Sequence, residues 1–309
     1  MKKRLAAGLL CVLLLAACAP AAAPEPEKLH IVAAIFPAYD FARAAAGNLA
    51  EVTMLLPPGA ESHSYEPTPA DILAVRDCDL FFYLGGESDA WVDGILETIR
   101  PGGSVLRMMD CVELLEEEEG HHHGHREGEV TELDEHVWTS PENAAVITRA
   151  VGEALAELDK THQAEYRANA EAYAEQLEEL DREFSDFFAG VSNKTMVFGD
   201  RFPLRYFAQR YGLDCRAAFP GCGGQTEPSA AVIAGLIERV EAERLSTVWY
   251  IEFSNHLVAD GVAEAAGAQT AMFHSCHNVA GEDLEAGATY LSLMRGNLLS
   301  LREHMPCDE

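Results

Sequence analysis

Short apolar runs alternate with amphipathic stretches through the first half of the chain. The runs end at turn-forming residues, as at Pro57-Pro58-Gly59 and Gly85-Gly86. The pattern predicts strands at 29–36, 52–56, 80–84 and 105–109, and helices at 39–50, 69–76 and 88–100. Strands that alternate with helices are typical of a parallel sheet covered by helices. We therefore predict an N-terminal α/β lobe over residues 28–140.

Residues 141–190 follow a different pattern, with helix-forming residues throughout and apolar positions at helical spacing. A break near Asp159-Lys160-Thr161 would leave a second helix of about 27 residues, roughly 40 Å long at 1.5 Å per residue. We predict that this segment is a helical spine between two lobes.

The strand–helix alternation returns after Gly190 and predicts a C-terminal α/β lobe over residues 191–309. The expected strands are 195–198, 215–219, 247–251 and 268–273, and the expected helices are 202–211, 229–242, 255–266 and 290–302. The predicted fold class is α/β, with two lobes, each a mostly parallel sheet flanked by helices, joined by one long rigid spanning helix.

The first 18 residues have the features of an export signal. Lys2, Lys3 and Arg4 precede an apolar run that is too short to span a membrane. The run ends in Leu-Ala-Ala-Cys18, which resembles the bacterial lipobox. We predict a lipoprotein signal peptide over 1–18, a lipidated Cys18, a Pro/Ala linker over 19–27 and an extracytoplasmic location at the cell membrane. The alternative is an ordinary signal peptide that is cleaved elsewhere.

The composition fits a soluble protein that follows this signal peptide. Hydrophobic residues make up 48% of the chain, enough for two modest cores. The formal net charge of −29 disfavours nucleic acid and anionic lipid as partners and favours cations. Solubility alone would also explain such a charge.

Cysteine usage fits an exported protein. Six cysteines lie beyond Cys18, namely Cys78, Cys111, Cys215, Cys222, Cys276 and Cys307. Six cysteines allow fifteen disulfide pairings, and the sequence does not choose among them. The chain has no CxxC motif, which disfavours a zinc ribbon or a thioredoxin-like site.

Residues 116–129 form a polar, glycine-punctuated segment with a cluster of histidines, His121, His122, His123 and His125. Such a composition predicts a loop without a packed core. The segment Asp134 to Trp138 follows, with His136 and Trp138 on one side of an extended chain, and Ser140-Pro141 then begins a helix. A histidine-rich loop just before a fixed histidine indicates metal binding.

Several motifs in order resemble the metal-binding solute receptors of bacterial ABC importers, the class that captures zinc or manganese. The matching segments are PPGAESHSYEPTP at 57–69, EHVW at 135–138, YFA at 206–208 before YGL at 211–213, EPS at 227–229, and the closing Tyr290, Met294 and Asn297. Each motif alone is a weak pattern, but together and behind a lipobox they are specific. The resemblance covers essentially the whole mature chain.

The resemblance implies two lobes with a metal ion held between them. The family pattern assigns His63 and His136 as the first two ligands. At the third position zinc members have histidine and some manganese members glutamate, whereas this chain has Asp200, which is either a ligand or a helix N-cap. The histidines of 116–129 match the low-affinity collecting loop of zinc members, although they could also have no role.

The fourth position departs from the family pattern, because the usual Asp or Glu is replaced by the segment Met272 to Asn278. We expect His274 to be the ligand, since it directly follows a predicted strand. Cys276, His277 and Cys222 are the other candidates for the metal. A disulfide between Cys222 and Cys276 is the alternative role for the two cysteines.

The resemblance implies a receptor that captures Zn²⁺, with Mn²⁺ less favoured, and delivers it to an ABC permease and its ATPase. Such a protein catalyses no reaction, and a monomer tethered by its lipid is expected. The alternatives are a manganese or iron receptor of the same class, a zinc-dependent hydrolase and an adhesin. The hydrolase has little support, because HExxH and GxSxG motifs are absent.

Overall fold

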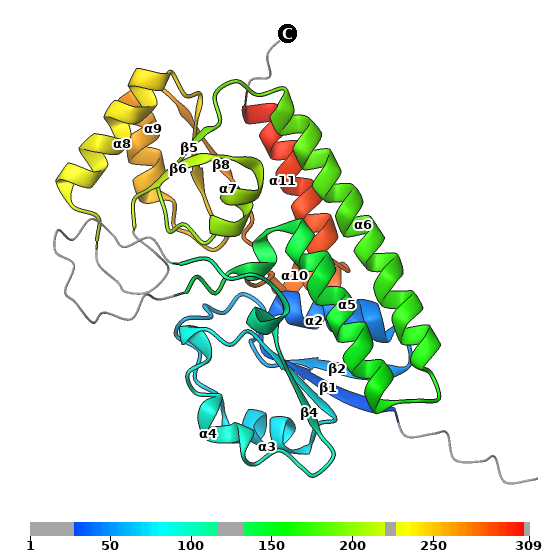
Figure 1. Ribbon diagram of the computed structural model, residues 1–309. Helices are drawn as coiled ribbons and strands as arrows, with labels where there is room; N and C mark the ends of the chain where they lie inside the picture. The colour runs from blue at the N-terminus through cyan, green and yellow to red at the C-terminus, as the bar shows by residue number, and fades with distance from the viewer. Residues whose placement is uncertain (1–27, 117–132, 220–226, 306–309) are drawn as a thin grey trace, which may run out of the picture.

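The computed structural model describes residues 28–116, 133–219 and 227–305. These residues contain two four-stranded sheets in which all strand pairs are parallel, with the orders β2-β1-β3-β4 and β6-β5-β7-β8 (Figure 1). The strands are β1 (Leu29–Ala33), β2 (Ala50–Met54), β3 (Leu80–Tyr83), β4 (Ser104–Arg107), β5 (Thr195–Phe198), β6 (Asp214–Ala217), β7 (Thr247–Tyr250) and β8 (Gln269–Met272). The prediction of two lobes with parallel sheets is confirmed.

Helices connect the strands of the first sheet. They are α2 (Phe36–Ala46), α3 (Pro69–Asp77) and the short α4 (Asp93–Leu96), with 3₁₀ turns at η1 (Glu87–Asp89) and η2 (Met108–Cys111). Helix α3 begins with a capping box, in which Thr68 and Asp71 each bond the backbone N–H of the other.

The helix expected at 88–100 is mostly irregular, and only η1 and α4 form there. The reason lies in Asp89, whose carboxylate accepts hydrogen bonds from the N–H groups of Leu84 (2.7 Å) and Gly85 (3.0 Å) at the end of β3. Such bonds from a side chain to a nearby backbone compete with helix formation.

Two long helices follow η3 (Val137–Thr139), namely α5 (Pro141–Leu158) and α6 (Gln163–Ala189). The predicted break between them is confirmed, and the carboxylate of Asp159 stabilises it by bonding the N–H of Thr161 (2.9 Å) and the ring of His162 (2.6 Å). The two helices approach closely at Gly152, where an added Cβ would lie 2.5 Å from the Cβ of Ala170. Figure 1 shows that α6, which has 27 residues, runs alongside both lobes.

The helices of the second lobe are α7 (Arg205–Tyr211), α8 (Ala230–Glu243), α9 (Leu257–Ala266), α10 (Gly281–Glu285) and α11 (Tyr290–His304). Gly199 follows β5 where α9 lies directly against the chain, and a Cβ at this position would overlap the backbone of Ala259. The close approach therefore requires glycine at the carboxyl end of the central strand of this sheet.

The two lobes share one hydrophobic core. A single cluster of buried side chains joins the first lobe to Phe198, Trp249 and Phe273 of the second, and a smaller cluster packs under α8 and α9. The buried carboxylate of Asp40 on α2 links this helix to α6 and α11, because it accepts the hydroxyl proton of Tyr173 (2.6 Å) and the N–H of Tyr290 (3.0 Å).

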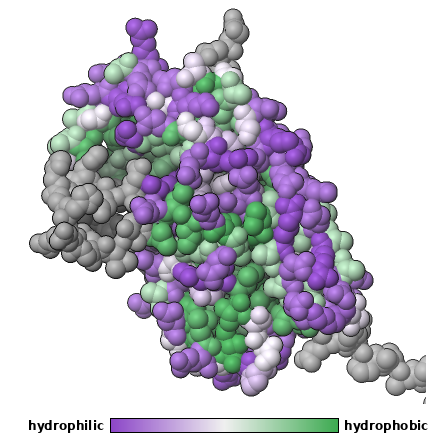
Figure 2. Space-filling model, viewed as in Figure 1, coloured by the Kyte–Doolittle hydropathy of each residue, from purple (hydrophilic) through white to green (hydrophobic). Residues whose placement is uncertain are grey.

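The outer face of the paired helices α5 and α6 is predominantly hydrophilic in the view of Figure 2. Among the described residues, none of the helices combines the length and the hydrophobicity that a membrane crossing requires. The predicted signal at 1–18 and the linker at 19–27 lie outside the described residues.

Candidate metal centre

Three histidines from three separate loops meet between the lobes. One ring nitrogen of each of His63, His136 and His277 lies within 4.8 Å of those of the other two. The ring centroids are 5.0 Å apart for His63 and His277, 5.4 Å for His136 and His277, and 5.8 Å for His63 and His136. Two of the loops follow the carboxyl ends of β2 and β8, where ligands of open α/β sheets usually bind.

The loop that carries His63 is fixed by contacts with both lobes. Gly59 adopts a φ of +77°, which favours glycine, and its N–H donates to the carbonyl of Val279 in the second lobe (2.9 Å). The side-chain amide of Asn278 donates to the carbonyls of Pro57 and Ala60, both at 2.8 Å. The loop of His63 and the loop of His277 therefore hold each other in register.

His136 is oriented by Asp134, two residues earlier in the chain. Oδ1 of Asp134 accepts the backbone N–H of His136 (2.8 Å) and lies 3.1 Å from its Nδ1. A carboxylate at this position favours the tautomer with hydrogen on Nδ1, which places the lone pair that could bind a metal on Nε2. Just beyond, Ser140 caps α5 by accepting the N–H of Asn143.

Glu135 orients a histidine from a different loop. Its Oε2 accepts hydrogen bonds from the N–H (3.1 Å) and the hydroxyl (3.0 Å) of Ser88, and its Oε1 lies 3.5 Å from Nδ1 of His63. The carboxylate is buried, and Gly86 leaves room for it, because a Cβ at Gly86 would overlap it. Two consecutive carboxylates thus serve two different histidines.

His277 completes the group from the second lobe. Its ring lies 4.8 Å from the ring of Trp138, and its Nε2 is buried without a hydrogen-bond partner among the described residues. Burial, together with the neighbouring His136 and His63, holds the pKa of His277 well below its usual range. The imidazole is therefore neutral at neutral pH, as a metal ligand must be.

The arrangement suits a tetrahedral zinc ion. Zinc–nitrogen bonds of ~2.0–2.1 Å place the nitrogens of a tetrahedral site about 3.4 Å apart. The three ring nitrogens are within 4.8 Å of one another, so small side-chain rotations would bring them to that spacing. Imidazole ligands also favour zinc over manganese, which prefers oxygen.

His274, which the sequence analysis favoured as a ligand, is outside this group. Its Nδ1 accepts the N–H of Cys276 (2.9 Å), and its own N–H and carbonyl are bonded to Asn297. The chain then turns at Cys276, whose φ is +59°. Because of this turn, His277 and not His274 approaches the other two histidines.

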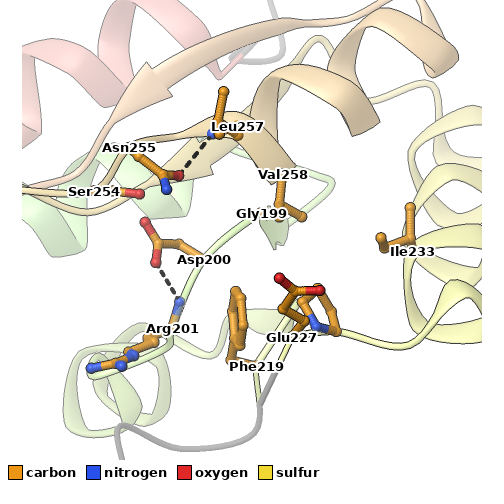
Figure 3. A pocket seen from close by; sticks show the side chains of 11 residues that line it. Gly199, Asp200, Arg201, Phe219, Glu227, Ile233, Ser254, Asn255, Leu257 and Val258 are labelled. Atoms are coloured by element: carbon orange, nitrogen blue, oxygen red, sulfur yellow. Dashed lines mark hydrogen bonds between the residues drawn. The ribbon is translucent and has the colours of Figure 1, made fainter. Parts of the chain in front are cut away.

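Asp200 is likewise outside the group of three histidines. Its carboxylate accepts the N–H of Arg201 (2.8 Å) and of Ile251 (3.3 Å), which are bonds to the backbone at strand ends. It lines a cavity of about 510 Å³ in the second lobe, together with Glu227 and Asn255 (Figure 3). None of the three histidines lines this cavity.

Cys276 is a free and fully buried thiol among the described residues, and its alternative role in a disulfide with Cys222 stays a prediction. Burial and the nearby carboxylate of Glu252 raise the pKa of this thiol. The thiol therefore stays protonated, which disfavours Cys276 as a metal ligand. Cys222, Cys18 and the histidine cluster of His121, His122, His123 and His125 lie outside the described residues.

Sequence reasoning missed the roles of Asp134 and Glu135, although it singled out the segment that contains them. The position of these two acidic residues directly before a candidate ligand histidine could have indicated their roles. Carboxylates commonly bond the second ring nitrogen of such histidines. His277 was among the candidates, and the turn that brings it into the site was not recognised.

Comparison with known proteins identifies relatives that match most of the chain. The zinc-binding lipoprotein AdcA of Streptococcus pneumoniae is 31% identical over 298 residues, which are 95% of this chain and 59% of the relative. The chain thus spans about 59% of that relative's length. The high-affinity zinc uptake system protein ZnuA of Bacillus subtilis is 28% identical over 304 residues, which cover 96% of this chain and 95% of the relative.

Solved structures show the same fold. The Zn(II)-bound ZnuA-like domain of S. pneumoniae AdcA superposes with a TM-score of 0.75 at 28% identity, covering 90% of this chain and 99% of that one. The laminin-binding protein Lmb of Streptococcus agalactiae, described as a bifunctional protein with adhesin and metal transporting activity, has a TM-score of 0.77 at 25% identity. That match covers 91% of this chain and 100% of the other.

The family model for ZnuA, the periplasmic component A of the zinc-uptake complex, matches residues 31–304. This range includes all strands except the first two residues of β1, and it includes His63, His136 and His277. The chain therefore belongs to the ZnuA family of extracytoplasmic zinc-uptake proteins.

Proposed function

We propose that this protein is a zinc receptor that captures Zn²⁺ outside the cytoplasm and delivers it to an ABC permease. The observation that carries the proposal is the convergence of His63, His136 and His277 between the lobes. Two of these rings face buried carboxylates that orient them, and the third is kept neutral by burial. Such preorganisation favours tight binding, because little ordering remains when the ion arrives.

The ligand set that we propose is His63, His136 and His277, and it replaces His274 and Asp200 of the sequence expectation. A fourth donor would come from water, since both oxygens of Glu135 are engaged by Ser88 and by the ring of His63. Zn²⁺ is the expected cargo, since all three protein donors are imidazoles.

A hydrolase is a poorer fit to this site. Catalytic zinc needs a general base beside an open coordination position. The carboxylates that contact the histidine rings, Asp134 and Glu135, are engaged with His136 and His63, and Glu135 is also engaged with Ser88. Neither is free to take a proton from a bound water.

The remaining expectations belong to the same proposal. Cys18 would carry the lipid that tethers the protein to the membrane, and the segment 116–129 would collect zinc weakly near the cleft. The receptor would act as a monomer. An adhesin role is a second candidate, favoured by the likeness to the S. agalactiae protein, and binding to immobilised laminin would test it.

Titration of zinc into metal-free protein tests the proposal. We expect one tight phase, which is lost in the triple variant His63→Ala, His136→Ala, His277→Ala, and a weak phase that disappears when 116–129 are deleted. A tight phase that survives the triple substitution would place the zinc site elsewhere. If deletion of 116–129 alone removed the tight phase, the loop and the three histidines would not have separate roles.

A further inference from the structure

Glu252 is a buried carboxylate whose two oxygens both bind the same serine. It follows β7 in the second lobe and is 9% exposed. Its Oε2 accepts the backbone N–H of Ser275, and its Oε1 accepts the Ser275 hydroxyl proton, both at 2.6 Å. Burying a carboxylate is unfavourable unless hydrogen bonds compensate, so this pairing indicates a specific role for the segment that it holds.

Ser275, held by Glu252, fixes the position of His277 in two ways. Its Oγ accepts the backbone N–H of His277 (3.3 Å). Its carbonyl accepts Nε1–H of Trp138 (3.0 Å), and the Trp138 ring lies 4.8 Å from the ring of His277. The serine therefore fixes the main chain of His277 and also the aromatic ring on which its imidazole rests.

The turn at Cys276, between Ser275 and His277, has a backbone conformation that is unfavourable unless neighbouring groups stabilise it. Cys276 has a φ of +59°, which L-residues with a Cβ rarely adopt. Its N–H donates to Nδ1 of His274 (2.9 Å), and the same Nδ1 lies 3.5 Å from Oε1 of Glu252. Because an Nδ1 that accepts this N–H has no proton to donate to the carboxylate, Glu252 supports the turn through Ser275.

We propose that Glu252 is a positioning residue for the metal centre, holding His277 at the correct place through Ser275 without binding the ion. This inference rests on the proposed zinc site. The role requires a carboxylate, because both groups of Ser275 that face it are donors. A glutamine has one acceptor oxygen, so the Ser275 hydroxyl would lose the acceptor of its proton and would have to turn to accept from the NH₂ group, while it already accepts the N–H of His277.

The test compares Glu252→Gln with the unaltered protein and with His277→Ala in a double-mutant cycle. Zinc dissociation constants are measured by competition with a chelator, and the visible absorption of bound Co²⁺ reports the ligand set. We expect Glu252→Gln to weaken zinc about 10- to 100-fold and to change the Co²⁺ spectrum. In the His277→Ala background the same change should have less than about a threefold effect, since its target is gone.

Asp181→Asn is the matched control, because Asp181 is also a buried carboxylate and bonds Arg210 (2.8 Å) and Tyr211 (2.9 Å) away from the histidines. It should lower thermal stability and leave both the zinc affinity and the Co²⁺ spectrum unchanged. If Glu252→Gln does not fold, Ser275→Ala removes the relay to His277 and should also weaken zinc by at least about tenfold.

The positioning role is overturned if zinc affinity is unchanged in these variants, or if Glu252→Gln costs the same factor with and without His277. The proposed function fails in a different way. In that case the unaltered protein would bind no zinc tightly, or His277→Ala would bind as well as the unaltered protein.

Discussion

Nδ1 of His63 lies 3.5 Å from Oε1 of Glu135, so a histidine of one loop is oriented by a carboxylate of another. The relationship depends on Gly86, because a Cβ at this position would overlap the Glu135 side chain. The geometry of the proposed metal centre therefore depends on residues outside the proposed ligand set.

Gly86→Ala should displace Glu135 and thereby loosen His63. We expect zinc affinity to fall by about tenfold or more, as for other residues that orient ligands. Stability should fall by about 1–3 kcal/mol, which is typical of overpacking. Gly94→Ala is the control, because a Cβ there meets nothing within 4 Å. Equal zinc affinities for the two variants would contradict the role of Glu135.

Asn278→Asp should uncouple the two loops that carry His63 and His277. The substitution replaces two hydrogen-bond donors with an oxygen that faces the carbonyls of Pro57 and Ala60. We expect a loss of about 1–3 kcal/mol in stability and a weaker zinc affinity. Asn255→Asp is the control, because its Oδ1 accepts the N–H of Leu257, a bond that aspartate retains. Urea unfolding and zinc competition measure the two effects, and an Asn278 variant that matches the control would contradict the coupling.

Zinc should stabilise the protein more than manganese does at equal concentration. A ligand that binds the folded state raises stability in proportion to the logarithm of its concentration over its dissociation constant. Three imidazoles favour zinc. We expect a larger rise in Tm with Zn²⁺ than with Mn²⁺ in metal-free protein. Equal shifts would indicate that oxygen ligands dominate the site.

The stability of the metal-free protein should depend on pH through Asp89. Burial raises the pKa of Asp89 to about 6, whereas an aspartate in the unfolded chain titrates near ~3.9. The folded protein therefore binds this proton more tightly, and the contribution of Asp89 to stability increases as the pH falls from 7 to 5. Asp89→Asn stays neutral and lacks this dependence.

We expect the free energy of unfolding of the unaltered protein, relative to Asp89→Asn, to rise by about 1.4 kcal/mol between pH 7 and pH 5. Urea unfolding of both proteins at the two pH values measures it. A difference that stays constant, or falls with acidification, would show that the pKa of Asp89 is not raised.

Much of the fold could be predicted from the sequence, because strands buried in parallel sheets appear as continuous apolar runs between turn residues. The break at Asp159 was also visible in the sequence. The loss of the expected helix at 88–100 was not, since it depends on the bond from Asp89 back to the end of β3.

The group of three histidines could be predicted in part. His63 and His136 lie in motifs whose residues are close in sequence. The third histidine depends on the turn at Cys276, which is stabilised by Glu252 and by Trp138, residues distant in sequence. We expected His274, directly after the predicted strand 268–273, to face the cleft, whereas the left-handed backbone at Cys276 brings His277 to the other two histidines.

The most direct test of the metal centre compares the zinc dissociation constants of His277→Ala and His274→Ala with that of the unaltered protein. Competition against a chelator of known affinity measures all three. We predict that His277→Ala weakens zinc binding more than about 100-fold, because it removes a proposed ligand, whereas removing a residue that acts only through the turn costs less. His274→Ala should therefore cost less than about tenfold. The reverse order, with affinity lost in His274→Ala and kept in His277→Ala, would contradict the assignment of His277 to the site.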